Sequence, residues 1–146
     1  PLYDMQWKRA MKAKLLAADG SPMPGLDNEK HKTVKQYVIE YRSIDTGIPV
    51  FISTPPLEGI KGVNNGRGKK VIEANLSEWT GQALMCDAYA GYDWVKKSGR
   101  ILCRCDAHAR RKMEAALKEN QRLAKIGMTL HQQILHKLLP EEWEDA

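Results

Sequence analysis

The chain has 146 residues, of which 42% are hydrophobic and 28% charged, and its formal net charge is +5. This length suits one domain with one core, and these proportions exclude a wholly disordered chain and a membrane protein. No apolar run approaches the roughly 18 residues that a membrane helix needs, and the N-terminus lacks a signal-peptide pattern, so we expect a cytoplasmic protein.

The charge is distributed unevenly along the chain. The segment 96–125 contains ten basic residues and three acidic ones. Such a segment favours a polyanionic partner, because neutralised phosphates release condensed counterions, although a solvated helix face gives the same pattern.

The cysteines and the two ends of the chain give two more expectations. Cys86, Cys103 and Cys105 are too few for a secreted disulfide scaffold, and their number is odd, so we expect reduced thiols. The chain begins at Pro1 and stops at Ala146, soon after a long helical pattern. We therefore expect a fragment of a longer polypeptide.

The first half of the chain predicts a short helix or arm at 4–14, followed by three strands. The apolar run LLAAD, 15–19, predicts a strand that gives way to a loop at the turn-rich GSPMPG. The stretches 36–44 and 49–54 are rich in β-formers and flank a turn, which predicts an antiparallel hairpin. Glycines and prolines predict a surface loop at 55–68.

The second half predicts alternating helices and short strands. A helix is expected at 69–79, and after Gly81 a strand at 83–87, a short helix at 92–97 and a strand at 101–105 follow. Asp106 is expected to cap one long helix from Ala107 to Leu139, which could bend near Gly127.

This order of elements predicts an α/β fold with a mixed sheet. Three antiparallel strands are joined through a helix to parallel strands, with flanking helices and a long C-terminal helix. The expected divisions are an N-terminal arm at 1–13, an α/β core at 14–106, and a basic helix with an acidic tail at 107–146.

Two of the predicted strands end on an aspartate, Asp19 and Asp87. If these strands lie side by side and parallel, both carboxylates emerge at one sheet edge, where they repel each other unless a cation neutralises them. Mg²⁺ and Mn²⁺ take such oxygen ligands, and a two-metal site can activate a water or hydroxyl for phosphodiester cleavage. Strand-end aspartates that only begin turns would give the same pattern.

Three stretches resemble motifs of one known family. GQALMCDAYAGYD, 81–93, and ILCRCDAHARRKM, 101–113, resemble the DGYxGY-like and CxAHxRRKF-like motifs of the insertion sequence 66 family of bacterial transposases. LAADGSPMPGLD, 16–27, is similar to that family's first catalytic segment, which is usually closer to ADET. The resemblance runs in order from about Leu15 to Leu139.

The resemblance implies a ribonuclease-H-like fold and an Asp-Asp-Glu, metal-dependent enzyme that cuts and joins DNA. By match to the motifs, Asp19 and Asp87 would be its first two metal-binding carboxylates, for Mg²⁺ or Mn²⁺. Gly20 replaces the preferred glutamate, Met113 replaces a phenylalanine, and no segment matches the one that carries the catalytic glutamate. We therefore expect an incomplete site, with transposon ends and target DNA as partners and a homo-oligomer in the full-length protein.

Basic residues of the second motif are predicted to contact the DNA backbone, because side-chain charge and the N–H groups of a helix start both favour anions. They are His108, Arg110, Arg111 and Lys112, together with Arg104 just before them. A non-catalytic DNA-binding module and a metal-dependent nuclease are the alternative functions.

The pattern CxCxxH, formed by Cys103, Cys105 and His108, raises the question of zinc. A structural zinc needs four ligands, and only Cys86 is an obvious fourth. We therefore expect the cysteines to fill a sheet interior and zinc to be absent.

Overall fold

The computed structural model describes residues 2–27, 31–54 and 68–138. The chain forms two compact units, Pro1–Arg104 and Cys105–Ala146. Most of the loop predicted at 55–68 and all of the acidic tail lie outside the described residues. Within the described part, no helix is long and apolar enough to cross a membrane.

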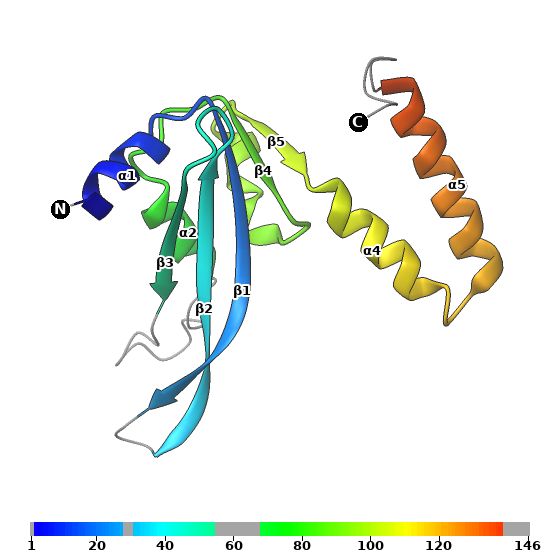
Figure 1. The fold of residues 1–146 in the computed structure, drawn as a ribbon, viewed down its shortest axis with the longest axis horizontal. Helices are drawn as coiled ribbons and strands as arrows, with labels where there is room; N and C mark the ends of the chain where they lie inside the picture. The colour runs from blue at the N-terminus through cyan, green and yellow to red at the C-terminus, as the bar shows by residue number, and fades with distance from the viewer. Residues whose placement is uncertain (1, 28–30, 55–67, 139–146) are drawn as a thin grey trace. The chain divides into compact units, whose positions relative to one another are not determined.

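The first unit is a five-stranded mixed sheet with helices (Figure 1). Its elements are α1 (Leu2–Ala10), β1 (Leu15–Asp27), β2 (Lys32–Ser43), β3 (Pro49–Thr54), α2 (Lys69–Asn75), β4 (Ala83–Cys86), the 3₁₀ turn η1 (Ala90–Tyr92), α3 (Trp94–Lys97) and β5 (Ile101–Arg104).

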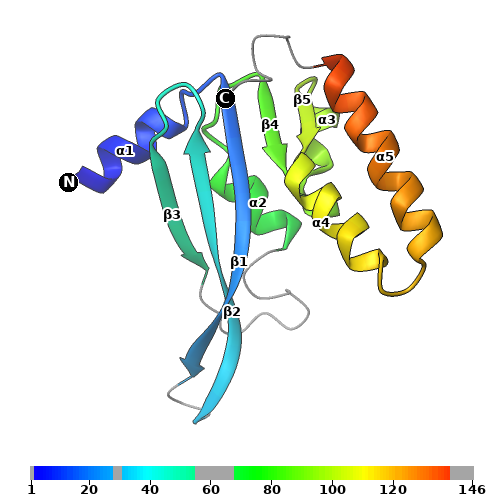
Figure 2. The same cartoon turned by 45° about the vertical axis from the view of Figure 1, so that its right-hand side comes forward.

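The strand order is β3-β2-β1-β4-β5, which Figure 2 shows across the sheet. β1 pairs antiparallel with β2, and β2 antiparallel with β3, whereas β1 with β4 and β4 with β5 are parallel. The predicted α/β mixed sheet is thereby confirmed. The parallel contact between the strands that carry Asp19 and precede Asp87, on which the metal hypothesis depends, is present.

β1 is longer than predicted, so the loop expected at GSPMPG is wrong. The strand stays paired with β2 as far as Asp27, although β4 leaves it after Ala18. Beyond that point no other strand of the described residues pairs with that edge of β1, and a proline is tolerated where its nitrogen needs no partner. Pro22 and Pro24 are two residues apart, so both nitrogens face the same side of the strand. Figure 1 shows the resulting β1–β2 hairpin reaching beyond the other strands.

One face of the sheet carries the core. Leu16 and Ala18 of β1 and Leu84 and Cys86 of β4 are buried there, because side chains alternate between the two faces of a strand. They pack with residues of α1, α2 and α3. The cluster includes Met11, Leu16, Ala18, Ile39, Tyr41, Ile72, Leu76, Trp79, Leu84, Cys86, Tyr92 and Val95.

Trp79 and Gly81 pack tightly in the segment that leads into β4. The helix predicted to reach Trp79 ends at Asn75, and the Trp79 indole, 1% exposed, donates from Nε1 to the carbonyl oxygen of Ala13 at 3.0 Å. Gly81 follows, and a Cβ there would lie 2.2 Å from that same oxygen. Arg100 covers the Trp79 ring and donates to the carbonyls of Trp79 and Gly81, both at 3.1 Å. Only glycine fits at position 81.

The second unit is a helical hairpin of α4 (Asp106–Ala116) and α5 (Gln121–Leu138), so the single long helix is wrong. The chain turns at 117–120, where the Asn120 side chain accepts the N–H of Leu123 at 3.1 Å and caps α5. Gly127, the expected bend, lies inside α5. The capping role expected of Asp106 is also wrong, since Cys105 precedes the helix and the Asp106 carboxylate pairs with His131.

Candidate functional site

Asp19 and Asp87 directly follow the last residues at which β1 and β4 pair with each other. Asp87 is just beyond the end of β4, whereas Asp19 lies inside β1, which runs to Asp27, so the strand end predicted at Asp19 is wrong. The parallel pairing of these strands ends at Ala18 opposite Cys86, so each aspartate is the next residue along the chain. Ala18 and Cys86 both face the core, and alternation along β1 therefore directs Asp19 to the opposite face. Asp19 is exposed and Asp87 half-buried.

A third carboxylate, which the sequence reasoning missed, lies opposite Asp19. Glu40 is its partner in the β1–β2 register. The Arg42 guanidinium pairs with Glu40, with its Nε and its Nη2 both 2.8 Å from Oε1. This pair offsets part of the negative charge beside Asp19. The sequence of β2 alternates like that of an ordinary strand, and only the β1–β2 register reveals that Glu40 lies beside Asp19.

Both aspartates accept a hydrogen bond from the backbone just after them. Asp19 Oδ1 accepts the N–H of Gly20 at 2.8 Å, and Asp87 Oδ1 accepts the N–H of Tyr89 at 3.0 Å. The second contact is an Asx turn, in which an aspartate side chain holds the chain two residues further on. Each bond restricts the direction of its carboxylate.

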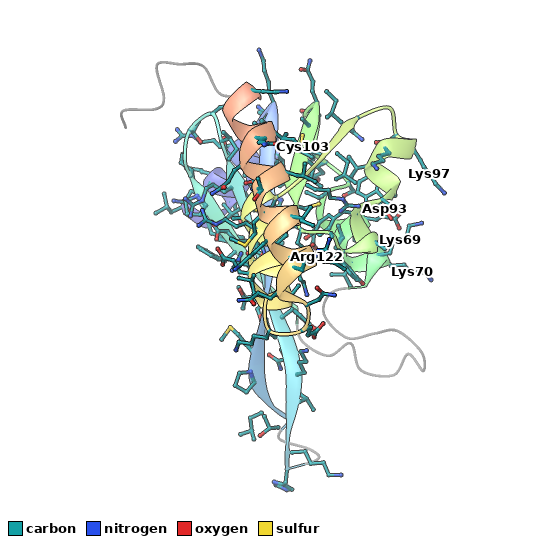
Figure 3. All side chains as sticks on the ribbon, turned by 90° about the vertical axis from the view of Figure 1, so that its right-hand side faces the viewer. Lys69, Lys70, Asp93, Lys97, Cys103 and Arg122 are labelled. Carbon is teal, nitrogen blue, oxygen red and sulfur yellow. The ribbon has the colours of Figure 1, made fainter. Side chains whose placement is uncertain are left out.

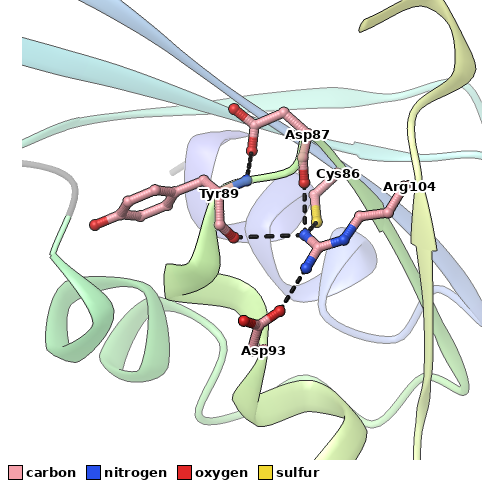
Figure 4. Close-up of polar contacts among 5 residues, drawn as sticks. All are labelled: Cys86, Asp87, Tyr89, Asp93 and Arg104. Atoms are coloured by element: carbon pink, nitrogen blue, oxygen red, sulfur yellow. Dashed lines mark hydrogen bonds and ion pairs between the residues drawn. The ribbon is translucent and has the colours of Figure 1, made fainter. Parts of the chain in front are cut away.

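Arg104, predicted to bind DNA, has several partners within its own unit (Figure 4). It ends β5, opposite Cys86 in the β4–β5 register. Its Nη1 donates to the carbonyl oxygens of Asp87 at 2.6 Å and Tyr89 at 3.4 Å, and lies 3.5 Å from the Cys86 sulfur. Its Nη2 pairs with the carboxylate of Asp93. A count of charges along the chain could not reveal these contacts of Arg104. The prediction that Arg104 contacts DNA stays a prediction.

The cysteines differ in their surroundings. Cys86 is buried, and burial raises the pKa of its thiol to about 11, with the Arg104 charge opposing part of the shift. Cys103 is exposed, so the expectation that the cysteines fill the sheet interior is right for Cys86 and wrong for Cys103. Within residues 2–27, 31–54 and 68–138, no group of three or more His, Cys, Asp or Glu side chains is arranged to hold a metal.

The other predicted DNA-binding residues lie on α4 of the second unit. Arg110, Arg111 and Lys112 are exposed, and His108 is half-buried. Arg110 donates to Glu114 Oε1 at 2.9 Å, and Arg111 donates to the Ala107 carbonyl at 3.3 Å. Both contacts are local and leave cationic surface exposed on α4.

The first unit exposes four further lysines, of which only two lie in the basic segment 96–125. Lys69 and Lys70 begin α2, and Lys96 and Lys97 end α3. All four are exposed, and Figure 3 shows Lys69, Lys70 and Lys97 on the outer surface of these helices. Lys69 forms a helical ion pair with Glu73 at 3.5 Å.

Comparison with known proteins agrees with the motifs. The family model described as "Transposase IS66 family" matches residues 1–141. No curated protein matches the chain. Because the family match covers nearly the whole sequence, the chain belongs to the IS66 family of transposases.

Proposed function

We propose that this chain carries part of the active centre of a DNA transposase, in which Asp19 and Asp87 hold Mg²⁺ or Mn²⁺. One observation carries the proposal: β1 and β4 pair in parallel up to Ala18 and Cys86, directly before the two aspartates. The strand order β3-β2-β1-β4-β5 also supports a ribonuclease-H-like fold for the first unit.

The two carboxylates suit such an ion chemically. Neighbouring strands lie about 4.8 Å apart, so side chains on one face at adjacent strand ends can share a cation. Mg²⁺ is usually bound by one or two carboxylates, with waters and substrate phosphates completing its shell. When bound, a divalent cation would activate the attacking water or 3′-hydroxyl and stabilise the leaving oxygen of the phosphodiester.

The residues of the chain have separate roles in metal binding and DNA binding. Asp19 and Asp87 supply oxygen ligands, and a further acid, expected in a longer parent chain, would complete the Asp-Asp-Glu set. Arg110, Arg111 and Lys112 offer exposed positive charge for the DNA backbone. We also propose that the parent acts in the cytoplasm as a homo-oligomer on transposon ends and target DNA.

Titration of the 146-residue chain with MnCl₂ by calorimetry tests the metal site. We expect one saturable site that disappears in both Asp19→Asn and Asp87→Asn. Asp45→Asn is the matched control, because Asp45 is an exposed acid in the β2–β3 turn that accepts the Lys14 N–H at 3.0 Å. A site that survives both aspartate substitutions, or no site at all, contradicts the proposal.

A non-catalytic DNA-binding module is the second candidate. It is favoured by the lack of a three-ligand group in the described residues and by the cationic surface of α4. Transposition by the parent separates the two functions. Asp87→Asn should abolish DNA cleavage while DNA binding persists, whereas unchanged transposition would leave only the binding role. For the isolated chain we expect weak DNA binding and little cleavage in Mn²⁺.

A further inference from the structure

We propose that Arg104 and Asp93 form a positioning pair that fixes the backbone carrying Asp87 and thereby sets the direction of its carboxylate. This inference rests on the proposed function, because it concerns a metal ligand of that site. Neither residue would touch the metal, and both would act through the chain segment that follows β4.

The sheet brings Arg104 to this segment. β5 runs parallel to β4, and Arg104 is opposite Cys86, one residue before Asp87. Its guanidinium reaches past the end of β4 to two main-chain carbonyl oxygens, those of Asp87 at 2.6 Å and Tyr89 at 3.4 Å. A planar guanidinium with several fixed donors can hold two carbonyls and one carboxylate at once, whereas an ammonium group cannot do so with the same geometry.

Asp93 anchors the other side of the guanidinium. It is at the start of α3, where it makes no side-chain capping bond, and its carboxylate pairs with Arg104 Nη2. Arg104 thus ties together the end of β5, the turn after β4 and the residue directly before α3, as Figure 4 shows.

Asp87 is therefore held at two points. Its carbonyl oxygen accepts from Arg104, and its carboxylate accepts the N–H of Tyr89. Figure 4 shows these two groups of Asp87 turned in different directions. Fixing the carbonyl limits rotation of the peptide group after Asp87, and the Asx turn limits rotation of the side chain. Together they select one orientation of the carboxylate.

Packing completes the rigid segment. Gly91 is buried, and a Cβ there would lie 2.3 Å from the Tyr89 ring, so this ring packs directly on the glycine backbone. Tyr89 also meets Tyr92 edge to face, with ring centroids 6.3 Å apart. The DAYAGYD stretch thus positions Asp87 through packing on one side and through Arg104 on the other.

The pair is too exposed to be explained by stability alone. The side chains of Arg104 and Asp93 are 36% and 52% exposed, and ion pairs at such positions contribute little to folding. Residues that orient a metal ligand, in contrast, typically change metal affinity by about 10- to 100-fold when they are removed. The two roles therefore predict different experimental results.

Mn²⁺ affinity of the full 146-residue chain, measured by calorimetry with MnCl₂ alone, separates these roles. Arg104→Gln should weaken Mn²⁺ binding by about 10- to 100-fold, and Asp93→Asn by a smaller factor. Arg104→Lys should bind Mn²⁺ more tightly than Arg104→Gln but less tightly than the unsubstituted chain, because lysine keeps the charge but lacks the planar guanidinium with its several N–H donors. The chemical shift of the Tyr89 amide should move in all three variants without metal.

Arg100→Gln is the matched control. Arg100 also donates to two main-chain carbonyls, those of Gly81 and Trp79, but it precedes β5 at the opposite end of the strand. This variant should unfold at least as easily as Arg104→Gln and bind Mn²⁺ like the unsubstituted chain. Circular dichroism confirms that each compared variant is folded, and Asp93→Asn keeps the test available if Arg104→Gln does not fold.

The outcomes distinguish this inference from the proposed function. If Asp19→Asn and Asp87→Asn abolish Mn²⁺ binding while Arg104→Gln and Asp93→Asn leave it unchanged, the positioning pair is overturned and the metal site stands. If the unsubstituted chain binds no Mn²⁺, both are overturned. A loss of affinity shared equally by Arg100→Gln would reduce Arg104 to a structural role and also overturn the inference.

Discussion

Asp87→Asn should make the metal-free chain more stable, although it removes a proposed catalytic group. Asp19 and Asp87 carry like charges directly after the last paired residues between β1 and β4, with Glu40 beside Asp19. Asparagine keeps an Oδ1 acceptor for the Tyr89 N–H, so the Asx turn survives while one negative charge is removed.

The size of this effect follows from Coulomb's law. Two unit charges about 5 Å apart interact by about 0.8 kcal/mol in water and by about 3 kcal/mol at an effective dielectric constant of about 20. Because Asp19 is exposed and Asp87 half-buried, the value lies toward the lower limit. We therefore expect Asp87→Asn to raise the free energy of unfolding by about 1 kcal/mol in low salt.

Urea unfolding followed by tryptophan fluorescence measures this change in the first unit. Asp19→Asn should give a similar gain, and the double variant little more than either single one, because each removes the same repulsion. In about 1 M NaCl, where the screening length is about 3 Å, most of the gain should vanish. A loss of stability in Asp87→Asn, or strictly additive gains, would refute the reasoning that the two carboxylates are close neighbours.

Three other predictions concern two glycines, a buried thiol and a helix cap. Gly81→Ala should lower the free energy of unfolding by about 1–3 kcal/mol in urea melts, because its Cβ would lie 2.2 Å from the Ala13 carbonyl oxygen. Gly127→Ala should raise it by about 0.5–1 kcal/mol, because among the described residues its Cβ would meet only the Met113 side chain, at an ordinary contact distance of 3.8 Å. Burial raises the pKa of the Cys86 thiol from 9.0 to about 11, so between pH 9 and 11 mainly the unfolded chain ionises this thiol. The free energy of unfolding should therefore fall by about 2 kcal/mol over that range. Cys86→Ala should remove this part of its pH dependence. Asn120→Ala should cost about 1 kcal/mol by removing the cap of α5, and an unchanged melting curve of the helical signal would count against the break in the helix.

The sheet could be predicted because its determinants are local. The alternation of 36–44 and 49–54 predicted the hairpin, and two short apolar runs predicted further strands. That those two strands are parallel neighbours was a condition of the metal hypothesis, which the pairing of β1 with β4 fulfils. The length of β1 could not be predicted in this way, since Pro22 and Pro24 are breakers in isolation and become acceptable only on an open strand edge. The break at 117–120 was missed because apolar periodicity continues on both sides of it.

The candidate site was predictable only in its acidic half. Asp19 and Asp87 are visible as carboxylates at the ends of short apolar runs, but the Arg104–Asp93 pair depends on the β4–β5 register and on a turn eleven residues before the arginine. A charge count treats Arg104 as one more cation for DNA. Long-range register, which no local pattern reports, decides which partner that cation has.

The most direct test of the central claim is an amide NMR spectrum of the 146-residue chain titrated with substoichiometric Mn²⁺, whose paramagnetism broadens nearby signals. If Asp19 and Asp87 share the ion, the amides of Gly20 and Tyr89 should broaden together, and Asp19→Asn should abolish both effects. Broadening of only one of the two amides, or broadening centred on another part of the chain, would contradict the account.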